Sequence, residues 1–243
     1  MIPKNLFQFH HSYEKLGIVE RVCVERWQLM NPDWDYHFVT NEEGDAVVRE
    51  LLGERFGLYE KAHFGAKNDL RRVAMLHKHG GLYADTDLYP IAPLRRYIPM
   101  DKDRVLFAYT NRDLFLGGLL ASKAGDPMTI EIINLSLDRM RERPAPPRES
   151  RETWMSWHFD VCGTHLSNDV YRNYIGSRTA IIRGGDSDGS TPDEDVKCYH
   201  YGTALWAPGG RPGRCVEEEL SFLNWAKGMQ IKLEAGLPPS VPC

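Results

Sequence analysis

The sequence predicts an α/β fold in which a mixed, mostly parallel sheet is flanked by helices. Two apolar strands, over residues 4–9 and 35–39, are separated by a helix over residues 19–30 whose apolar positions recur at helical spacing. A second helix over residues 66–79 leads through a Gly-Gly pair into another short strand. Strands that alternate with helices in this way form parallel sheets. The length of 243 residues fits one large domain with a sizeable core.

The stretch from Ala66 to Leu88 organises the rest of the prediction. Apolar residues recur at helical spacing in its first half, and glycine at positions 80 and 81 ends the helix because glycine takes a positive φ at little cost. A short apolar strand follows, and Asp85-Thr86-Asp87 stands where this strand emerges. Ligands of open α/β sheets bind outside the carboxyl ends of the strands, so we expect a site at this turn.

The two aspartates of this turn favour a divalent cation. Residues one apart on extended backbone point to opposite faces, so both carboxylates can serve one ion only if the backbone turns there. Mg²⁺ and Mn²⁺ prefer such oxygen ligands and often share them with substrate phosphates. Asp85 and Asp87 therefore predict a metal–diphosphate site. A solvated acidic turn is the alternative, since an Asp-x-Asp sequence is common by chance.

The whole stretch resembles the DXD-containing sugar-binding region of GT-A glycosyltransferases. It is most similar to glycosyltransferase family 32 and its relatives, which include mannosyl- and galactosyltransferases and the clostridial glucosylating toxins. The residues that match, with the family's spacing kept, are Asp69, Arg72, Gly80, Gly81, Tyr83, Asp85, Thr86 and Asp87. The resemblance implies a GT-A fold, a nucleotide-sugar donor and a metal-dependent transfer reaction.

The resemblance also implies roles for the helix that precedes the turn. Asp69 is expected to accept hydrogen bonds from donor-sugar hydroxyls, while Arg72 holds Asp69 and reaches the sugar or the diphosphate. Both are expected in the first turns of a helix that begins at 65–68, where the helix dipole favours anions. The alternative is a simple i,i+3 ion pair worth roughly 0.2–0.5 kcal/mol. Arg71 is a neighbouring candidate that points elsewhere.

The N-terminal strand supplies a further candidate, because Ile2-Pro3-Lys4 resembles the family's opening segment. His10 stands where relatives carry a tryptophan that stacks on the nucleotide base. An imidazole can also stack on a base, although its face is smaller. The alternative is a loop histidine without a ligand. Phe7 occupies a position where a histidine is common in the family.

A third metal ligand is expected near the C-terminal end. The last predicted strand, over residues 197–201, carries His200, and Trp206 follows it at the family's six-residue spacing. A neutral imidazole suits Mn²⁺ beside two carboxylates. The resemblance therefore implies a metal site formed by Asp85, Asp87 and His200, with an ordinary core histidine as the alternative.

The segments between these motifs complete the predicted architecture. Where many relatives carry an asparagine near the sugar, this chain has Gly117, which leaves the donor sugar open. Trp154, Trp157 and His158 form a cluster that predicts core packing of a helix, with an acceptor platform as the alternative. The remaining expected elements are strands over 105–109, 114–122 and 180–183, helices over 126–140, 164–174 and 216–233, a proline-rich loop over 141–150 and an acidic loop over 184–195.

Composition narrows the class of protein. The net charge of −4 does not indicate a nucleic-acid partner, and the five cysteines contain no C-x-x-C pair. We therefore expect reduced thiols and no disulfide framework. No apolar run predicts a signal peptide or a transmembrane segment. The expected location is cytoplasmic, with peripheral contact at a membrane left open.

The predicted function is transfer of a hexose-type sugar from a UDP- or GDP-linked donor to a glycan, glycolipid or other hydroxyl acceptor, with retention. One GT-A domain over 1–243 is expected, with a nucleotide-sugar-binding half over 1–125 and an acceptor half over 126–243. The residues expected to take part in transfer are Asp69, Arg72 and Asp87. Those expected to bind the donor are His10, Asp69, Arg72, Tyr83, Asp85, Thr86 and Asp87. The alternatives are a haloacid-dehalogenase-type phosphohydrolase and a non-catalytic nucleotide-sugar-binding module.

Overall fold

The computed structural model describes residues 1–108, 114–146, 151–183, 198–200 and 221–228. A six-stranded sheet forms the centre of the molecule, in the order β2-β1-β3-β6-β5-β7. Its strands are β1 (Asn5–Phe9), β2 (Asp35–Val39), β3 (Gly81–Ala84), β5 (Arg104–Ala108), β6 (Phe115–Ser122) and β7 (Thr179–Arg183). A separate two-stranded sheet pairs β4 (Leu88–Pro90) with β8 (Cys198–His200).

The large sheet is mixed and mostly parallel, as the sequence predicts. β1 pairs in parallel with both β2 and β3, and β5 pairs in parallel with β7. β6 lies between β3 and β5 and runs antiparallel to both. Reversal of this single strand places Leu119, in the middle of β6, beside Ala84 at the end of β3, where the Asp85–Asp87 turn begins.

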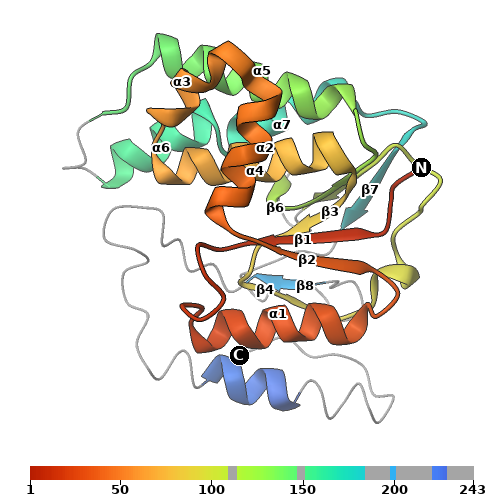
Figure 1. The fold of residues 1–243 in the computed structure, drawn as a ribbon. Coiled ribbons are helices and arrows are strands. Elements are labelled where there is room, and N and C mark those ends of the chain that lie inside the picture. The colour runs from red at the N-terminus through yellow and green to blue at the C-terminus, as the bar shows by residue number, and fades with distance from the viewer. Residues whose placement is uncertain (109–113, 147–150, 184–197, 201–220, 229–243) are drawn as a thin grey trace.

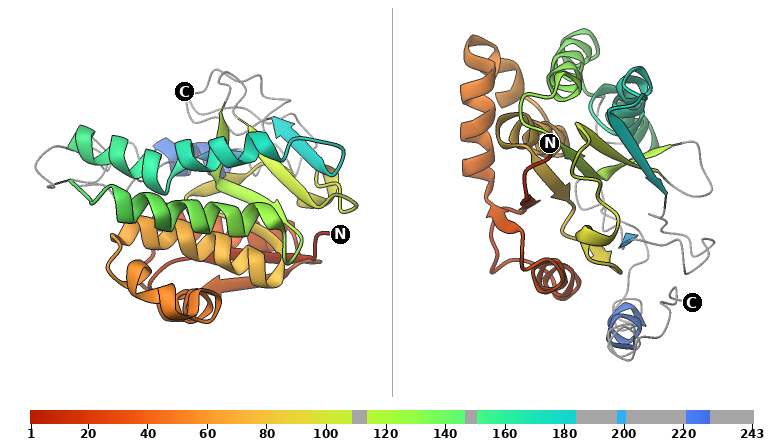
Figure 2. Two further views of the ribbon diagram at one scale, coloured as in Figure 1. Left: turned by 90° about the horizontal axis from the view of Figure 1, so that it is seen from above. Right: turned by 90° about the vertical axis from the view of Figure 1, so that its right-hand side faces the viewer.

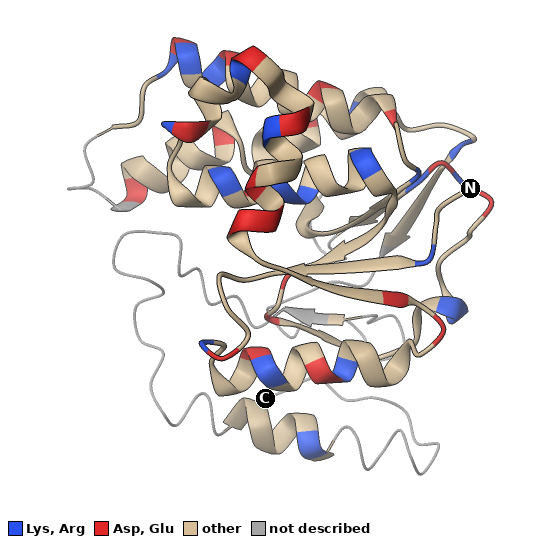
Figure 3. Ribbon diagram, in the orientation of Figure 1, with Lys and Arg blue, Asp and Glu red and all other residues tan. Residues whose placement is uncertain are grey.

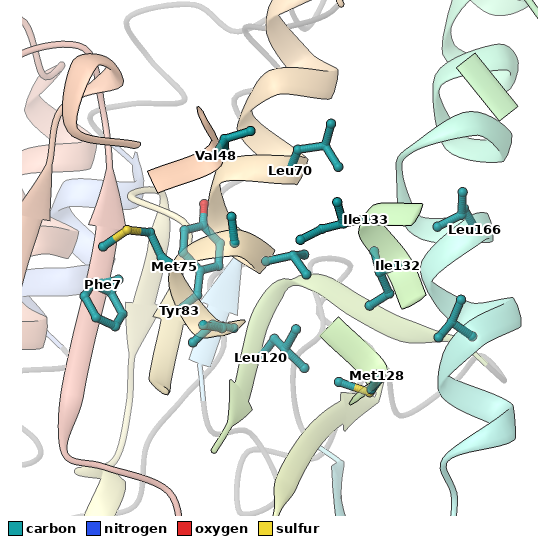
Figure 4. Packing of buried hydrophobic residues seen from close by; sticks show 14 of the residues in the cluster. Phe7, Val48, Leu70, Met75, Tyr83, Leu120, Met128, Ile132, Ile133 and Leu166 are labelled. Atoms are coloured by element: carbon teal, nitrogen blue, oxygen red, sulfur yellow. The ribbon is translucent and has the colours of Figure 1, made fainter. Parts of the chain in front are cut away.

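One face of the sheet is covered by a broad layer of helices, seen above the sheet in Figure 1. The layer contains α2 (Asn41–Leu52), η1 (Gly53–Arg55), α3 (Phe56–Glu60), α4 (Phe64–His79), α5 (Pro127–Glu142), α6 (Arg151–Val161) and α7 (Thr164–Asn173). Figure 4 shows how these helices and the sheet share one apolar core, with Leu70, Ile133 and Leu166 facing the side chains of β3 and β6. The helices are therefore held by buried apolar area.

The opposite face carries fewer elements. Here α1 (Ile18–Met30) and η2 (Leu94–Arg96) cover a second core built around Trp27, Leu82 and Phe107. The indole N–H of Trp27 donates to the Leu88 carbonyl oxygen at 2.8 Å and so ties α1 to β4. The right-hand view of Figure 2 shows the sheet between the two layers. The fold is a three-layer arrangement with the sheet in the middle.

The turn from α4 into β3 needs both of its glycines. Gly80 has φ 64° and Gly81 has φ 124°, values that side chains other than glycine rarely adopt. A Cβ at Gly80 would also lie 2.5 Å from the Ala124 amide nitrogen, and one at Gly81 would clash with the Asn5 carbonyl oxygen. This turn can therefore be tight enough to bring β3 directly against β1.

Local signals set several other boundaries. Thr40 and Glu43 form a reciprocal capping box at the start of α2, as their spacing predicts. Asp126 caps α5 by accepting from the Met128 amide at 2.9 Å, and Pro127 occupies the first helical position. α5 continues through Glu142, so only the later part of the expected 141–150 loop lies beyond the helix, and 147–150 lie outside the described residues.

The C-terminal helix is described over residues 221–228, within the 216–233 that the sequence predicts. Phe222 and Ala226 are buried against Val19 and Tyr89, so this helix packs on the outer side of α1 and β4. None of the helices in the described ranges combines the length and the apolar character that crossing a membrane requires. Acidic and basic residues are interspersed along α1 and the upper helices in Figure 3.

Candidate functional site

The Asp85–Asp87 segment forms a tight turn between β3 and β4. The Leu88 amide donates to the Asp85 carbonyl oxygen at 3.2 Å, and the Gln8 side chain donates to the same oxygen at 3.1 Å. On extended backbone the two carboxylates would point to opposite faces. The turn observed here removes this obstacle to their facing one site. Asp87 is only 7% exposed, so a freely solvated acidic turn does not describe this segment.

Arg72 lies at the centre of the polar groups beside this turn. Its Nη1 donates to the Gly117 carbonyl oxygen at 2.7 Å and lies 3.7 Å from Asp85 Oδ1. Its Nη2 lies 2.7 Å from Asp69 Oδ1, and its guanidinium stacks over the Tyr83 ring, 4.8 Å from the ring centre. One arginine thus joins the carboxylate of the helix to the first carboxylate of the turn.

The surroundings fix the charge states of this group. Burial lowers the pKa of Arg72, but the nearby Tyr83, Asp85 and Asp69 outweigh it and hold that pKa above its ordinary value. Burial, together with the negative charge of Asp85, raises the pKa of Tyr83 well above its ordinary value. The Tyr83 hydroxyl therefore stays protonated at neutral pH and donates to Asp85 Oδ1.

A cavity of about 490 Å³ opens onto these residues. A volume of this size fits a ligand of drug-like dimensions. The cavity is lined by every donor-binding residue that the sequence predicts, namely His10, Asp69, Arg72, Tyr83, Asp85, Thr86 and Asp87. Gly117 also lines it, and a Cβ at this position would meet Thr164 Oγ1 at 3.5 Å, an ordinary contact distance.

His10 lies at the end of β1, on the edge of the sheet that also carries the turn. Its Nδ1 is 2.7 Å from the Ser12 carbonyl oxygen, and its ring centre lies 4.2 Å from that of His11. Both histidines line the cavity, and of the two the sequence analysis singles out only His10.

Of His200, only the backbone can be placed. β8 pairs antiparallel with β4, and His200 lies opposite Leu88, the residue after Asp87. The predicted strand therefore exists and reaches the carboxylate turn. The side chain of His200, Trp206 and the acidic loop lie outside the described residues.

The structure bears on two expectations about α4, namely the position of Asp69 in the helix and the direction of Arg71. The helix begins at Phe64, with His63 as its cap, so Asp69 lies in the second turn rather than at the start. The helix dipole therefore gives Asp69 only weak support, because that effect fades beyond the first turn. Arg71 does point away, as expected, since it is 3% exposed and pairs with Asp45 at 2.7 Å.

The sequence missed the wall of the cavity that α6 and α7 provide. His158 is 3% exposed, and its Nε2 lies 3.0 Å from Asp69 Oδ2. Cys162 follows one turn later with its Sγ 3.3 Å from His158 Nδ1. Of the predicted aromatic cluster, Trp154 is a core residue at 1% exposed, whereas His158 faces the cavity. The i,i+4 spacing of His158 and Cys162 was the available signal, because such residues share one helix face.

Comparison with protein families identifies the central stretch. Residues 19–105 match the model described as "Glycosyltransferase sugar-binding region containing DXD motif". This range contains Asp69, Arg72 and the Asp85–Asp87 turn. The chain therefore contains a glycosyltransferase sugar-binding region. No curated protein matches the sequence closely enough to add a relative.

A solved structure has a fold similar to that of this chain. "PaToxG Glycosyltransferase" is similar over 72% of this chain and 69% of that chain, with a TM-score of 0.53 and 12% identity. Two others are less similar. A glycosyltransferase involved in the glycosylation of the major capsid of PBCV-1 is similar over 81% of this chain and 92% of that chain, with a TM-score of 0.43 and 12% identity. The UDP-bound glycosyltransferase domain from the YGT toxin is similar over 99% of this chain and 80% of that chain, with a TM-score of 0.45 and 9% identity.

Proposed function

We propose that this chain is a glycosyltransferase that moves a hexose-type sugar from a UDP- or GDP-linked donor to a glycan, glycolipid or other hydroxyl acceptor, with retention. The observation that carries the proposal is the convergence of Asp69, Arg72 and the Asp85–Asp87 turn on one cavity. Polar groups that meet in a largely preformed pocket are the usual sign of a ligand site.

The oxygen donors of the turn fit a divalent cation. Asp85 and Asp87 both line the cavity, and carboxylates are ligands that Mn²⁺ and Mg²⁺ accept. We propose that these two residues, with His200, would hold the metal. When bound, the ion supplies stabilisation of the charge that develops on the departing nucleoside diphosphate.

The neighbouring helix fits a sugar. Asp69 Oδ2 is buried and has no hydrogen-bond donor among the described residues, although Asp69 Oδ1 is paired with Arg72. A buried acceptor without a donor costs about 1–3 kcal/mol, and a hydroxyl group of the donor sugar would remove that cost. Arg72 would orient Asp69 and meet the diphosphate, since it spans both carboxylates.

The proposed reaction is a front-face displacement. The bond between the anomeric carbon and the diphosphate oxygen breaks, and a bond from that carbon to the acceptor oxygen forms on the same face. The acceptor proton passes to the departing phosphate, so no protein carboxylate has to act as a nucleophile. Asp69 and Arg72 orient the sugar for this attack. Holding the reacting groups in the right geometry lowers the barrier to transfer.

The test is donor hydrolysis with the full chain. Nucleotide sugars are screened with Mn²⁺ by thermal shift, where a true donor at about 100 times its dissociation constant adds about 2.7 kcal/mol of stability. The hits are then assayed for release of nucleoside diphosphate, with and without an acceptor glycan. Asp87→Asn should lose metal-dependent release, whereas Asp101→Asn, an exposed carboxylate, should not.

The outcomes separate the alternatives. Release of inorganic phosphate from phosphate esters, with no action on nucleotide sugars, would support the phosphohydrolase and contradict the proposal. Tight donor binding with neither hydrolysis nor transfer would support the binding module. The family match already favours a transferase over both.

A further inference from the structure

Asp69, His158 and Cys162 form a line of contacts on one wall of the cavity. Asp69 comes from α4, and the other two come from one face of α6 and the residue that follows it. His158 Nε2 lies 3.0 Å from Asp69 Oδ2, and His158 Nδ1 lies 3.3 Å from Cys162 Sγ. All three line the cavity, and His158 and Cys162 have no role in the function proposed above.

The Asp69 carboxylate is only half satisfied in this arrangement. Oδ1 lies 2.7 Å from Arg72, but Oδ2 is buried without a hydrogen-bond donor among the described residues. The His158 contact is close, yet its N–H direction does not meet hydrogen-bond geometry. Oδ2 can therefore accept a hydrogen bond from a donor group of a ligand.

Cys162 lies beside the Nδ1 nitrogen of His158. Burial, and then the negative charge of Asp69, raise the pKa of the Cys162 thiol well above its ordinary value, so the group stays S–H at neutral pH. The thiol has two acceptors within reach, the His158 carbonyl oxygen at 3.4 Å and Nδ1 at 3.3 Å. When the S–H points at Nδ1, that nitrogen accepts and the ring proton lies on Nε2. This tautomer, assigned from the contact, places an N–H beside Asp69.

We propose that His158 and Asp69 together bind one hydroxyl group of the donor sugar. The hydroxyl oxygen accepts from the His158 Nε2–H and gives its own proton to Asp69 Oδ2. A hydroxyl about 2.8 Å from both atoms closes a triangle with the 3.0 Å contact between them. The inference rests on the proposed function and adds His158 as a specificity-determining residue.

A metal ion is the competing occupant. The three side chains offer ligand atoms within 4.8 Å of one another, and a thiolate, an imidazole and a carboxylate suit Zn²⁺. However, Cys162 lies beside Nδ1 whereas Asp69 lies beside Nε2. The closest contacts therefore run through different ring nitrogens, whereas one ion would bind a single nitrogen and take its other two ligand atoms from within 4.8 Å of it. The observed geometry favours the hydroxyl.

The first test separates sugar from nucleotide. The full chain is titrated by calorimetry in Mn²⁺ with the nucleoside diphosphate and with the intact nucleotide sugar. His158→Ala should bind the nucleoside diphosphate within about twofold of wild type and the nucleotide sugar roughly tenfold more weakly. His158→Gln should recover much of the loss, because its amide can donate from a position near Nε2.

His165→Gln is the matched control. His165 also pairs with an aspartate, Asp160, at 2.9 Å, but both are exposed and neither lines the cavity. This variant should bind both ligands as wild type does. Equal weakening of both ligands by His158→Ala, or no weakening at all, would overturn the inference.

The second test begins with wild type and adds His158→Gln for comparison. Wild type is given a series of donors that each lack one sugar hydroxyl. One deoxy donor should bind or react roughly tenfold worse, and His158→Gln should show a smaller penalty for that donor alone. Uniform penalties in both proteins would contradict a shared hydroxyl. Inhibition by Zn²⁺ that Cys162→Ser relieves would assign the wall to a metal instead. Failure of wild type to bind any nucleotide sugar would count against the proposed function itself.

Discussion

Gly118 and Asp85 lie in contact across the two antiparallel strands of the site. The Asp85 amide donates to the Gly118 carbonyl oxygen at 2.8 Å, and a Cβ on Gly118 would clash with Asp85 Oδ2. β6 therefore contacts both the backbone and the side chain of Asp85. The Asp85 side chain can occupy its position only because residue 118 has no side chain.

Gly118→Ala should consequently displace the Asp85 carboxylate. We expect at least a tenfold loss of metal-dependent nucleoside-diphosphate binding, with overpacking that costs about 1–3 kcal/mol of stability. The measurements are calorimetric titration with Mn²⁺ and urea denaturation. Gly57→Ala is the control, because a Cβ there meets nothing within 4 Å and should leave both quantities nearly unchanged. Normal metal affinity in Gly118→Ala would show that the turn does not depend on this contact.

The contrast between local and distant residues explains how far the sequence could predict the site. Asp69, Arg72 and the Asp85–Asp87 turn belong to one helix–turn–strand unit, so their spacing alone fixes most of their arrangement. His158 approaches Asp69 from a helix 89 positions later in the chain, and no periodicity encodes that meeting. Its helix was predicted, but the packing of α6 against α4 was not.

The direction of β6 and the start of α4 could not be predicted from the sequence either. The apolar run that forms β6 predicts a strand but not that it lies antiparallel between β3 and β5. Histidine is not a preferred cap, so His63 gave no signal that α4 begins at Phe64. In contrast, the capping box of Thr40 and Glu43 is a local sequence pattern, and it marks the start of α2 in the structure.

The buried pair of Arg104 and Asp126 should contribute strongly to stability. Asp126 is fully buried, caps α5 and receives Arg104 Nε at 3.0 Å. Arg104→Met leaves that carboxylate without its cation, which typically costs about 3–5 kcal/mol. Chemical denaturation should show this loss with an unchanged denaturant slope. Lys4→Met removes an exposed pair with Asp33 and should cost less than about 1 kcal/mol; equal costs would contradict the assignment.

Asp103 should make stability depend on acidic pH. Hydrogen bonds from Arg178 at 2.6 Å and Lys123 at 3.0 Å hold the pKa of Asp103 well below its ordinary value. A carboxylate with a lowered folded-state pKa stabilises the fold above its unfolded pKa, near ~3.9, and this contribution is lost as the pH falls toward the folded value.

The check is the difference in unfolding free energy between wild type and Asp103→Asn, followed from pH 7 down to about pH 3. The difference should be constant above about pH 5 and shrink below about pH 4. Asp101→Asn, whose carboxylate is exposed, serves as the control and should show little difference at any pH. A wild-type advantage that grows on acidification would have the wrong sign for this explanation.

The last prediction decides whether Asp69 and Arg72 are a simple helix-surface ion pair. Their side chains are 15% and 14% exposed, and Arg72 also contacts Asp85 and the Gly117 carbonyl oxygen. Residues in one such network couple by about 0.5–3 kcal/mol. A double-mutant cycle of Asp69→Ala and Arg72→Ala, measured by denaturation, should therefore give a coupling near or above about 1 kcal/mol. Asp138 and Arg141 provide the matched i,i+3 control at 50% and 62% exposed, where the expected coupling is about 0.2–0.5 kcal/mol. Equal couplings in the two cycles would reduce Asp69 and Arg72 to a surface pair and remove the reason to place the sugar beside them.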